Sequence, residues 1–265
     1  MKTTKFFTAV FCFFMLTFSI QTVNAQPIKP KQLLKKVDTS VSNIQTVTYK
    51  INYSNKFSSN KDTIHRTAIC TLSIYDKDET KNQFILSTNI SDKYHHYLYD
   101  ATHGASISYP KDSLKEAKKW IINNDIGVYN RATSGILLLD YFGGNNRFRE
   151  SRSIWTNLLI KNMEIKEVVH LNEPAYLLII YTKNVKIIPN YMQNAVNKYY
   201  IRKKDYLPIA CSFYGEIEGI SEYEYYEIDY LAINPDVPLG AFKIDSTNAK
   251  AQLELLHENI QKHGL

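Results

Sequence analysis

Acidic side chains gather late in the sequence, where paired carboxylates could perform glycosidase chemistry. In that chemistry one carboxylic acid protonates the leaving group and a second carboxylate acts as nucleophile or base. The cluster comprises Glu216, Glu218, Glu222, Glu224, Glu227 and Asp229. Alternation places its first two members on one face of a strand and the next two on one face of the following strand, across a hairpin at 219–220. Because Arg202, Lys203 and Lys204 end a neighbouring strand, a solvated, charge-paired face is the simpler interpretation.

Histidines and serines offer no better catalytic pattern. His95, His96 and His103 form the densest histidine group, but adjacent residues of a strand point to opposite faces, which separates the first two. A solvated strand and turn therefore explains the group better than a metal site. The sequence has no Gly-x-Ser-x-Gly motif of a nucleophile elbow. We predict a non-enzymatic protein with no metal and no cofactor.

A compact group of arginines could contact another molecule. Arg147, Arg149 and Arg152 lie near Trp155, a combination that suits an anionic lipid head group or an acidic protein surface. The alternative is the solvated start of a helix.

Cys70 and Cys211 each stand on the apolar side of an alternating segment, so both are expected to face the core. A disulfide needs α-carbons within about 7 Å. The sequence leaves open whether they form a bridge or two buried thiols.

The first 25 residues predict a secretory signal peptide. Lys2 and Lys5 precede an apolar run over 6–20, and Ala25 ends a short-side-chain cleavage site. The run is too short and too interrupted for a membrane anchor, which needs about 20 apolar residues. We expect cleavage after Ala25, an exported, periplasmic location and no stable membrane span.

Composition favours one folded domain over 26–265. Of the 265 residues, 44% are hydrophobic and 22% are charged, which is too apolar for wholesale disorder. The whole chain carries 32 basic and 26 acidic side chains, and removal of two lysines with the signal leaves a net charge of +4. A charge so close to neutral does not call for a nucleic-acid partner.

The periodicity of apolar residues predicts an α+β fold with an antiparallel sheet. A helix over 30–43 leads into alternating segments, then short helices, then alternation again and a final helix over 246–263. The predicted strands are 47–53, 63–75, 82–89, 94–100, 105–109, 163–170, 175–182, 196–203, 208–218 and 221–233. The predicted short helices are 111–122, 133–142 and 150–159. Helices and strands do not interleave at the spacing of a parallel α/β fold.

This order resembles the outer-membrane lipoprotein carrier superfamily, the LolA and LolB type. The resemblance lies in the helix leading into Val47-Thr48-Tyr49-Lys50-Ile51, in Leu207-Pro208 after a charged turn, and in the closing segment 233–244. It implies a curved antiparallel sheet that forms an unclosed half-barrel, covered by helices, with an apolar cavity between them.

The resemblance also implies a function. The protein would be a periplasmic carrier for a lipid or for lipoprotein acyl chains. The expected cavity wall comprises Leu72, Ile74, Phe84, Leu86, Ile209 and Phe213, with Leu138 on a covering helix over 136–139. Ordinary core packing is the alternative for these residues. The alternative functions are an envelope protein-protein interaction module and a glycoside or ester hydrolase that uses the acidic cluster.

Overall fold

The computed structural model describes residues 27–57, 62–75, 81–123, 135–138, 160–186, 191–238, 240–244 and 248–265. The predicted signal peptide and Arg147, Arg149, Arg152 and Trp155 lie outside these residues. The predicted helix over 150–159 and Leu139 also lie outside them.

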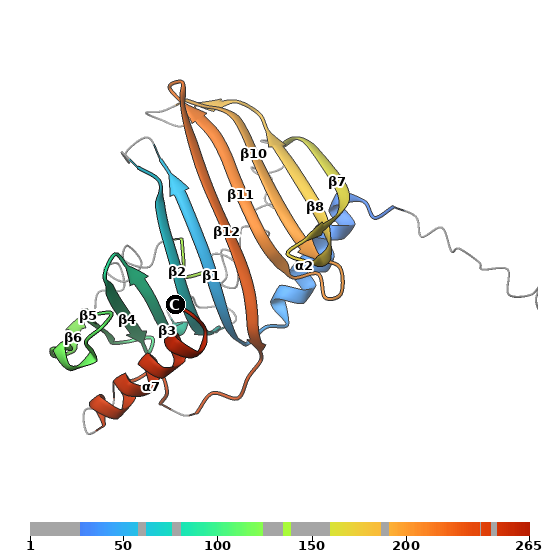
Figure 1. Ribbon diagram of the computed structural model, residues 1–265. Coiled ribbons are helices and arrows are strands. Elements are labelled where there is room, and N and C mark those ends of the chain that lie inside the picture. Colours follow the sequence, from blue (N-terminus) through green and yellow to red (C-terminus); the bar gives the residue numbers. More distant parts are fainter. Residues whose placement is uncertain are drawn as a thin grey trace, which may run out of the picture.

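A single large antiparallel sheet dominates the fold (Figure 1). Within the described residues its strands are β1 (Thr46–Lys56), β2 (Ile64–Ser73), β3 (Gln83–Ile90), β4 (Lys93–Tyr99), β5 (Gly104–Pro110), β6 (Ile121–Asn123), β7 (Ile160–His170), β8 (Glu173–Thr182), β9 (Val185–Lys186), β10 (Tyr191–Arg202), β11 (Pro208–Ile217) and β12 (Ile220–Ile233). The strand order is β6-β5-β4-β3-β2-β1-β12-β11-β10-β8-β7, and β9 pairs with β10 outside this path.

The first and last long strands join the two halves of the sheet. β1 pairs with β12 on one side and with β2 on the other, all antiparallel. The two ends of the strand order, β6 and β7, are not paired with each other in the part of the chain that the structure describes. The sheet is therefore a curved, unclosed half-barrel, as the sequence predicts.

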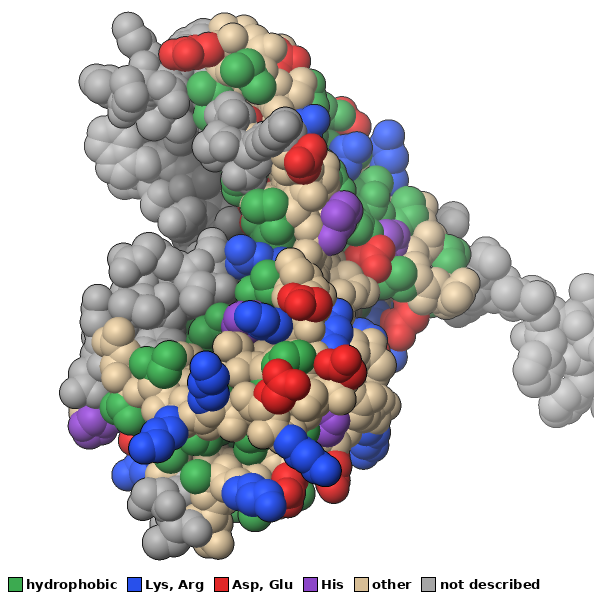
Figure 2. All heavy atoms as spheres, turned by 60° about the vertical axis from the view of Figure 1, so that its left-hand side comes forward, with side chains coloured by type: hydrophobic (Ala, Val, Ile, Leu, Met, Phe, Trp, Pro, Cys, Tyr) green, Lys and Arg blue, Asp and Glu red, His purple; other side chains and the backbone are tan. Residues whose placement is uncertain are grey.

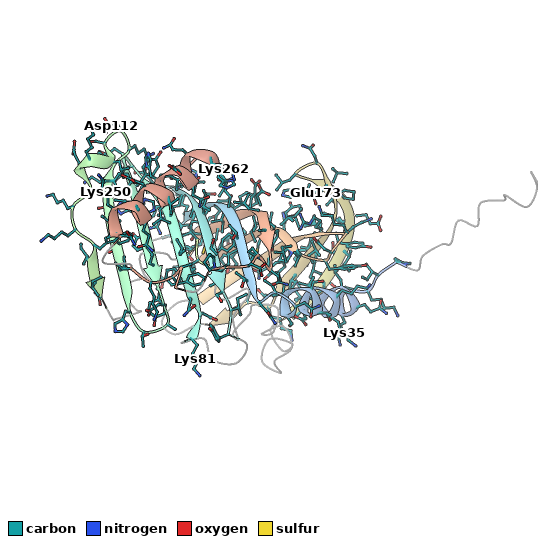
Figure 3. The ribbon with its side chains drawn as sticks, turned by 90° about the horizontal axis from the view of Figure 1, so that it is seen from below. Lys35, Lys81, Asp112, Glu173, Lys250 and Lys262 are labelled. Atoms are coloured by element: carbon teal, nitrogen blue, oxygen red, sulfur yellow. The ribbon has the colours of Figure 1, made fainter. Side chains whose placement is uncertain are left out.

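Two α-helices are described, and they lie on opposite faces of the sheet (Figures 1 and 3). Helix α2 (Pro30–Ser42) covers the face that we call the inner face, and helix α7 (Ala249–Lys262) covers the other, the outer face. Neither helix is both long and apolar enough to cross a membrane.

Side-chain alternation divides the core between these faces. On the inner face α2 and the odd-numbered apolar residues of β1 belong to one large buried cluster, which includes Tyr49 and Ile51. On the outer face Ile69, Tyr94 and Tyr109 pack with Leu253 and Ile260 of α7 in a second cluster. Strands covered on both faces explain why β4 is buried along most of its length.

Two of the predicted short helices are wrong. Residues 111–122 form a turn, a 3-10 helix (Leu114–Glu116) and part of the edge strand β6. Leu114, Ala117 and Trp120 pack against the outer cluster. A 3-10 helix aligns residues that are three positions apart, as it does here for the first two. The described residues of the predicted helix over 133–142 form a turn at 135–138.

Candidate functional site

A groove beside helix α2 is the candidate site. The helix begins at Pro30, which a first helical turn tolerates because that position needs no amide hydrogen. Leu33, Leu34, Val37 and Val41 are buried on its sheet-facing side. The helix is thereby fixed on the inner face, and its opposite side remains free to line a groove.

The groove has a volume of about 710 Å³. It lies between α2 and two tyrosines from the far half of the sheet, one on β8 and one in the turn between β10 and β11. The lining residues are Ile28, Gln32, Lys35, Lys36, Thr39, Ser40, Tyr176 and Tyr206. Its volume is within the usual range of small-molecule sites, about 300–1,000 Å³.

Tyr206 owes its place to a strained turn. Its φ of 59° lies in the left-handed region, which costs a residue other than glycine about 1–3 kcal/mol. Arg202 donates two hydrogen bonds to Asp205, at 3.0 and 2.6 Å, and the Leu207 amide donates to the same carboxylate at 3.2 Å. Burial lowers the pKa of Arg202, but Asp205, Glu173 and Tyr230 together outweigh it and raise that pKa. The charged pair of Arg202 and Asp205 holds the turn that presents Tyr206.

The two tyrosine rings form a flat wall with a lysine against each. Tyr176 and Tyr206 stack with centroids 6.4 Å apart and an angle of 7° between planes. Lys36 Nζ lies 4.4 Å from the Tyr206 centroid and donates to its hydroxyl at 3.2 Å. Lys203 Nζ lies 4.8 Å from the Tyr176 centroid and pairs with Glu167 at 2.7 Å. Cation–π contacts of this kind favour a fixed wall.

The groove borders the inner core. Its apolar members Ile28, Tyr176 and Tyr206 are partly buried and pack against the large cluster. Met163 and Ile165 of the edge strand β7 are also partly buried against that cluster. The groove therefore has a rim that carries Lys35 and Lys36. Its apolar floor consists of Ile28 and the two rings of the tyrosine wall.

Most predicted wall residues lie in the inner core. Leu72, Phe84 and Leu86 are fully buried there, and Leu138 is 5% exposed. Leu138 is held by a turn in place of the expected helix, since its amide donates to Tyr49 Oη at 2.9 Å. Ile74 is partly buried at the margin of the cluster.

The two predicted wall residues of β11 do not belong to the buried inner cluster: Ile209 faces the outer hollow, and Phe213 lies on the inner side beyond the cluster. Ile209 sits at the register shift where β10 meets β11, and it lines a second hollow of about 390 Å³ on the outer face. Glu173, Glu227 and Asp229 line the same hollow with Lys50 and further residues. Phe213 is half-buried, and its ring lies 3.0 Å from the position that a β-carbon on Gly215 would take.

The sheet separates the acidic cluster. On β12, Glu222 and Glu224 share the inner side with Tyr226, whereas Glu227 and Asp229 face the outer hollow. The expected partners of these acids form other ion pairs. Arg202 pairs with Glu173 and Asp205, Lys203 with Glu167, and Lys204 with Glu173. The interpretation of one charge-paired face was therefore wrong.

His96 is fully buried, which corrects the expectation of a solvated strand. Its Nδ1 lies 2.7 Å from Ser87 Oγ, and its Nε2 lies 2.9 Å from Tyr109 Oη. The Tyr109 hydroxyl also lies 3.0 Å from Nδ1 of His257 on α7. Burial, and then the charges of His257 and His95, lower the pKa of His96 to about 3. This polar chain ties the sheet to α7.

Cys70 and Cys211 are both buried and not joined by a disulfide, which settles the open choice in favour of thiols. Burial raises the pKa of Cys70 to about 12, so it is a poor nucleophile. The described residues contain no cluster of three or more His, Cys, Asp or Glu that could hold a metal ion. On the view in Figure 2, basic and acidic side chains are interspersed.

The sequence reasoning missed the groove residues. Gln32, Lys35 and Lys36 stand on the polar side of a predicted helix, where a solvated face is expected. Tyr176 and Tyr206 come from separate strands, and only the tertiary fold stacks them. The one available signal was the charged turn before Leu207.

No protein-family model matches the sequence, and the curated proteins contain no match. Among solved structures, LprF from Mycobacterium bovis is 8% identical, with a TM-score of 0.46 over 80% of this chain and 96% of that one. Lipoprotein LppX from Mycobacterium tuberculosis is 10% identical, with a TM-score of 0.37 over 80% and 100%. A LolA superfamily protein from Nitrosomonas europaea is 10% identical, with a TM-score of 0.33 over 82% and 98%. At these identities and TM-scores the likeness concerns the overall fold alone.

Proposed function

We propose that this protein is an exported, periplasmic and non-enzymatic carrier that binds a lipid or the acyl chains of a lipoprotein. The observation that carries the proposal is the groove of about 710 Å³ between α2 and the tyrosine wall. The predicted signal peptide over residues 1–25 supports the location.

The chemistry of the groove suits an acyl chain. Each buried CH₂ contributes about 0.8 kcal/mol, so an apolar floor holds a chain without any catalytic group. Ile28, Tyr176 and Tyr206 supply that floor. A chain that penetrates further would meet the inner core layer with Leu72 and Leu86, which are among the wall residues proposed from the sequence.

An envelope protein-protein interaction module is the second candidate. The edge strand β7 favours it, because Val169 is 73% exposed and the adjoining Leu171 is 48% exposed. An extended segment of a partner could pair with such an edge. Lys161 and Lys166 are exposed on the same strand, and charged side chains on an edge oppose pairing. We therefore prefer the carrier.

A matched pair of tryptophan variants tests the groove. Thr39 lines the groove, whereas Ser42 is exposed on the same helix outside the lining. We expect Thr39→Trp to fill the groove and to lower the affinity for a fluorescent fatty acid about tenfold or more, since it excludes several CH₂ groups. Ser42→Trp should bind as the parent protein does. Equal binding by all three proteins would show that the ligand binds outside the groove.

A further inference from the structure

We propose that the groove is selective for an anionic amphiphile, a fatty acid whose carboxylate is bound by Lys35 and Lys36 while its chain follows Ile28 and Tyr176. This inference rests on the proposed carrier function and specifies the class of its ligand.

The lining of the groove is cationic. Among its described residues it contains two lysines and no carboxylate. Neither Lys35 nor Lys36 forms an ion pair with any carboxylate that the structure describes, although Lys203 nearby is paired with Glu167. The two ammonium groups therefore lie beside an apolar floor, and no carboxylate of the described lining balances their charge. A ligand carboxylate would supply it through charge-assisted hydrogen bonds.

One of the two lysines is already oriented. Lys36 Nζ is held at the Tyr206 ring and hydroxyl, and Tyr206 is fixed by the turn that Arg202 and Asp205 stabilise. An ammonium group has three donor hydrogens, so Lys36 can keep its bond to Tyr206 and donate to a carboxylate as well. Pre-orientation reduces the entropy lost on binding.

The polar residues around the lysines fit the same ligand. Thr39 Oγ1 donates to the Lys35 carbonyl at 2.9 Å, within the helix itself. Ser40 and Gln32 line the groove with a hydroxyl and an amide, which can donate to a second carboxylate oxygen. Lys35 lies on the exposed side of α2 (Figure 3).

The outer hollow offers no equivalent site for an anion. Glu173, Glu227 and Asp229 line it against Lys50 and Arg202. Arg202 already pairs with Asp205 and Glu173, and Lys50 donates to the carbonyls of residues 263 and 264. A carboxylate entering there would meet the negative charges of Glu227 and Asp229, beside cations that already have partners. The groove is thus the better site for an acidic ligand.

The test compares a fluorescent fatty acid with its methyl ester, which has the same chain and no charge. Binding is measured on the mature protein, residues 26–265, at low and at high salt. We expect the acid to bind about tenfold tighter than the ester, because one charge-assisted contact is worth about that much. High salt should reduce this preference, and it should leave the affinity for the ester unchanged.

Matched variants locate the charge. Lys35→Gln/Lys36→Gln should abolish the preference for the acid and retain binding of the ester, while Lys31→Gln, exposed on the same helix outside the lining, should retain both. Circular dichroism confirms that the variants are folded. Equal binding of acid and ester, or an equal loss in Lys31→Gln, overturns the head-group inference and leaves the carrier standing. Failure of both probes to bind the parent protein refutes the carrier function itself.

Discussion

The buried His96 makes the stability of this protein dependent on pH in a calculable way. The folded state lowers the pKa of His96 to about 3, whereas an unfolded histidine titrates near about 6.5. As the pH falls below 6.5 the unfolded chain takes up a proton that the folded chain does not, so the stability contributed by neutral His96 is lost between about pH 6.5 and pH 3. At pH 4.5 the linkage amounts to about 3 kcal/mol relative to pH 7.5.

The measurement is urea unfolding at pH 7.5 and pH 4.5 for the parent protein and for His96→Gln. Carboxylates also titrate in this interval, and the comparison between proteins removes their shared contribution. We expect the free energy of unfolding to fall by about 3 kcal/mol more in the parent than in His96→Gln, whatever the cost of the substitution itself. His65→Gln, at an exposed position on β2, should keep the pH dependence of the parent. If the free energy of unfolding fell equally in the parent and in His96→Gln, His96 would not be a buried, neutral imidazole in the folded state.

Three substitutions test the packing of the inner face, each followed by chemical or thermal unfolding. Gly135 has a φ of 78°, and a β-carbon there would overlap the Tyr53 ring. Gly135→Ala should therefore destabilise the fold by about 2 kcal/mol or more. An unchanged melting temperature would contradict this close approach. Tyr49→Phe removes the acceptor of the Leu138 amide and should cost about 1–3 kcal/mol, and a neutral result would show that the amide finds another partner. Phe84→Ala should cost about 3–5 kcal/mol because the ring is fully buried, and a loss below 1 kcal/mol would indicate ligand space beside it instead of packed core.

Much of the sheet could be predicted because apolar and polar residues alternate along its strands. The segments predicted at 47–53 and 208–218 correspond to β1 at Thr46–Lys56 and β11 at Pro208–Ile217. One face of each of these strands packs against the large inner cluster, so every second residue is apolar and the period of two is visible in the sequence. The helix predicted over 30–43 is α2 for the same kind of reason, since its apolar stripe faces the sheet.

The prediction failed where tertiary contacts override local preference. Residues 111–122 contain good helix formers, yet Leu114 and Trp120 pack beside α7 and the chain continues into the edge strand β6. The sequence predicts a solvated strand around His96, because nothing in it shows that α7 covers that face of the sheet. Its partner His257 is far away in the sequence.

The candidate site was the least predictable part. Its tyrosine wall depends on Tyr206 in a left-handed conformation, which is rare for a residue with a side chain. The turn was visible in the sequence, but the stacking of Tyr206 on Tyr176 arises from the pairing of β8 with β10. Lysines on a helix surface carry no local sign that they line a groove.

Native mass spectrometry of residues 26–265, purified gently from a bacterial envelope, tests the central claim most directly. Organic extraction and lipid identification follow on the same sample. The carrier account predicts a stoichiometric lipid or acylated peptide, released by extraction and reduced in Thr39→Trp. A ligand-free mass, with no uptake of added fluorescent fatty acid, would contradict it and favour the interaction module.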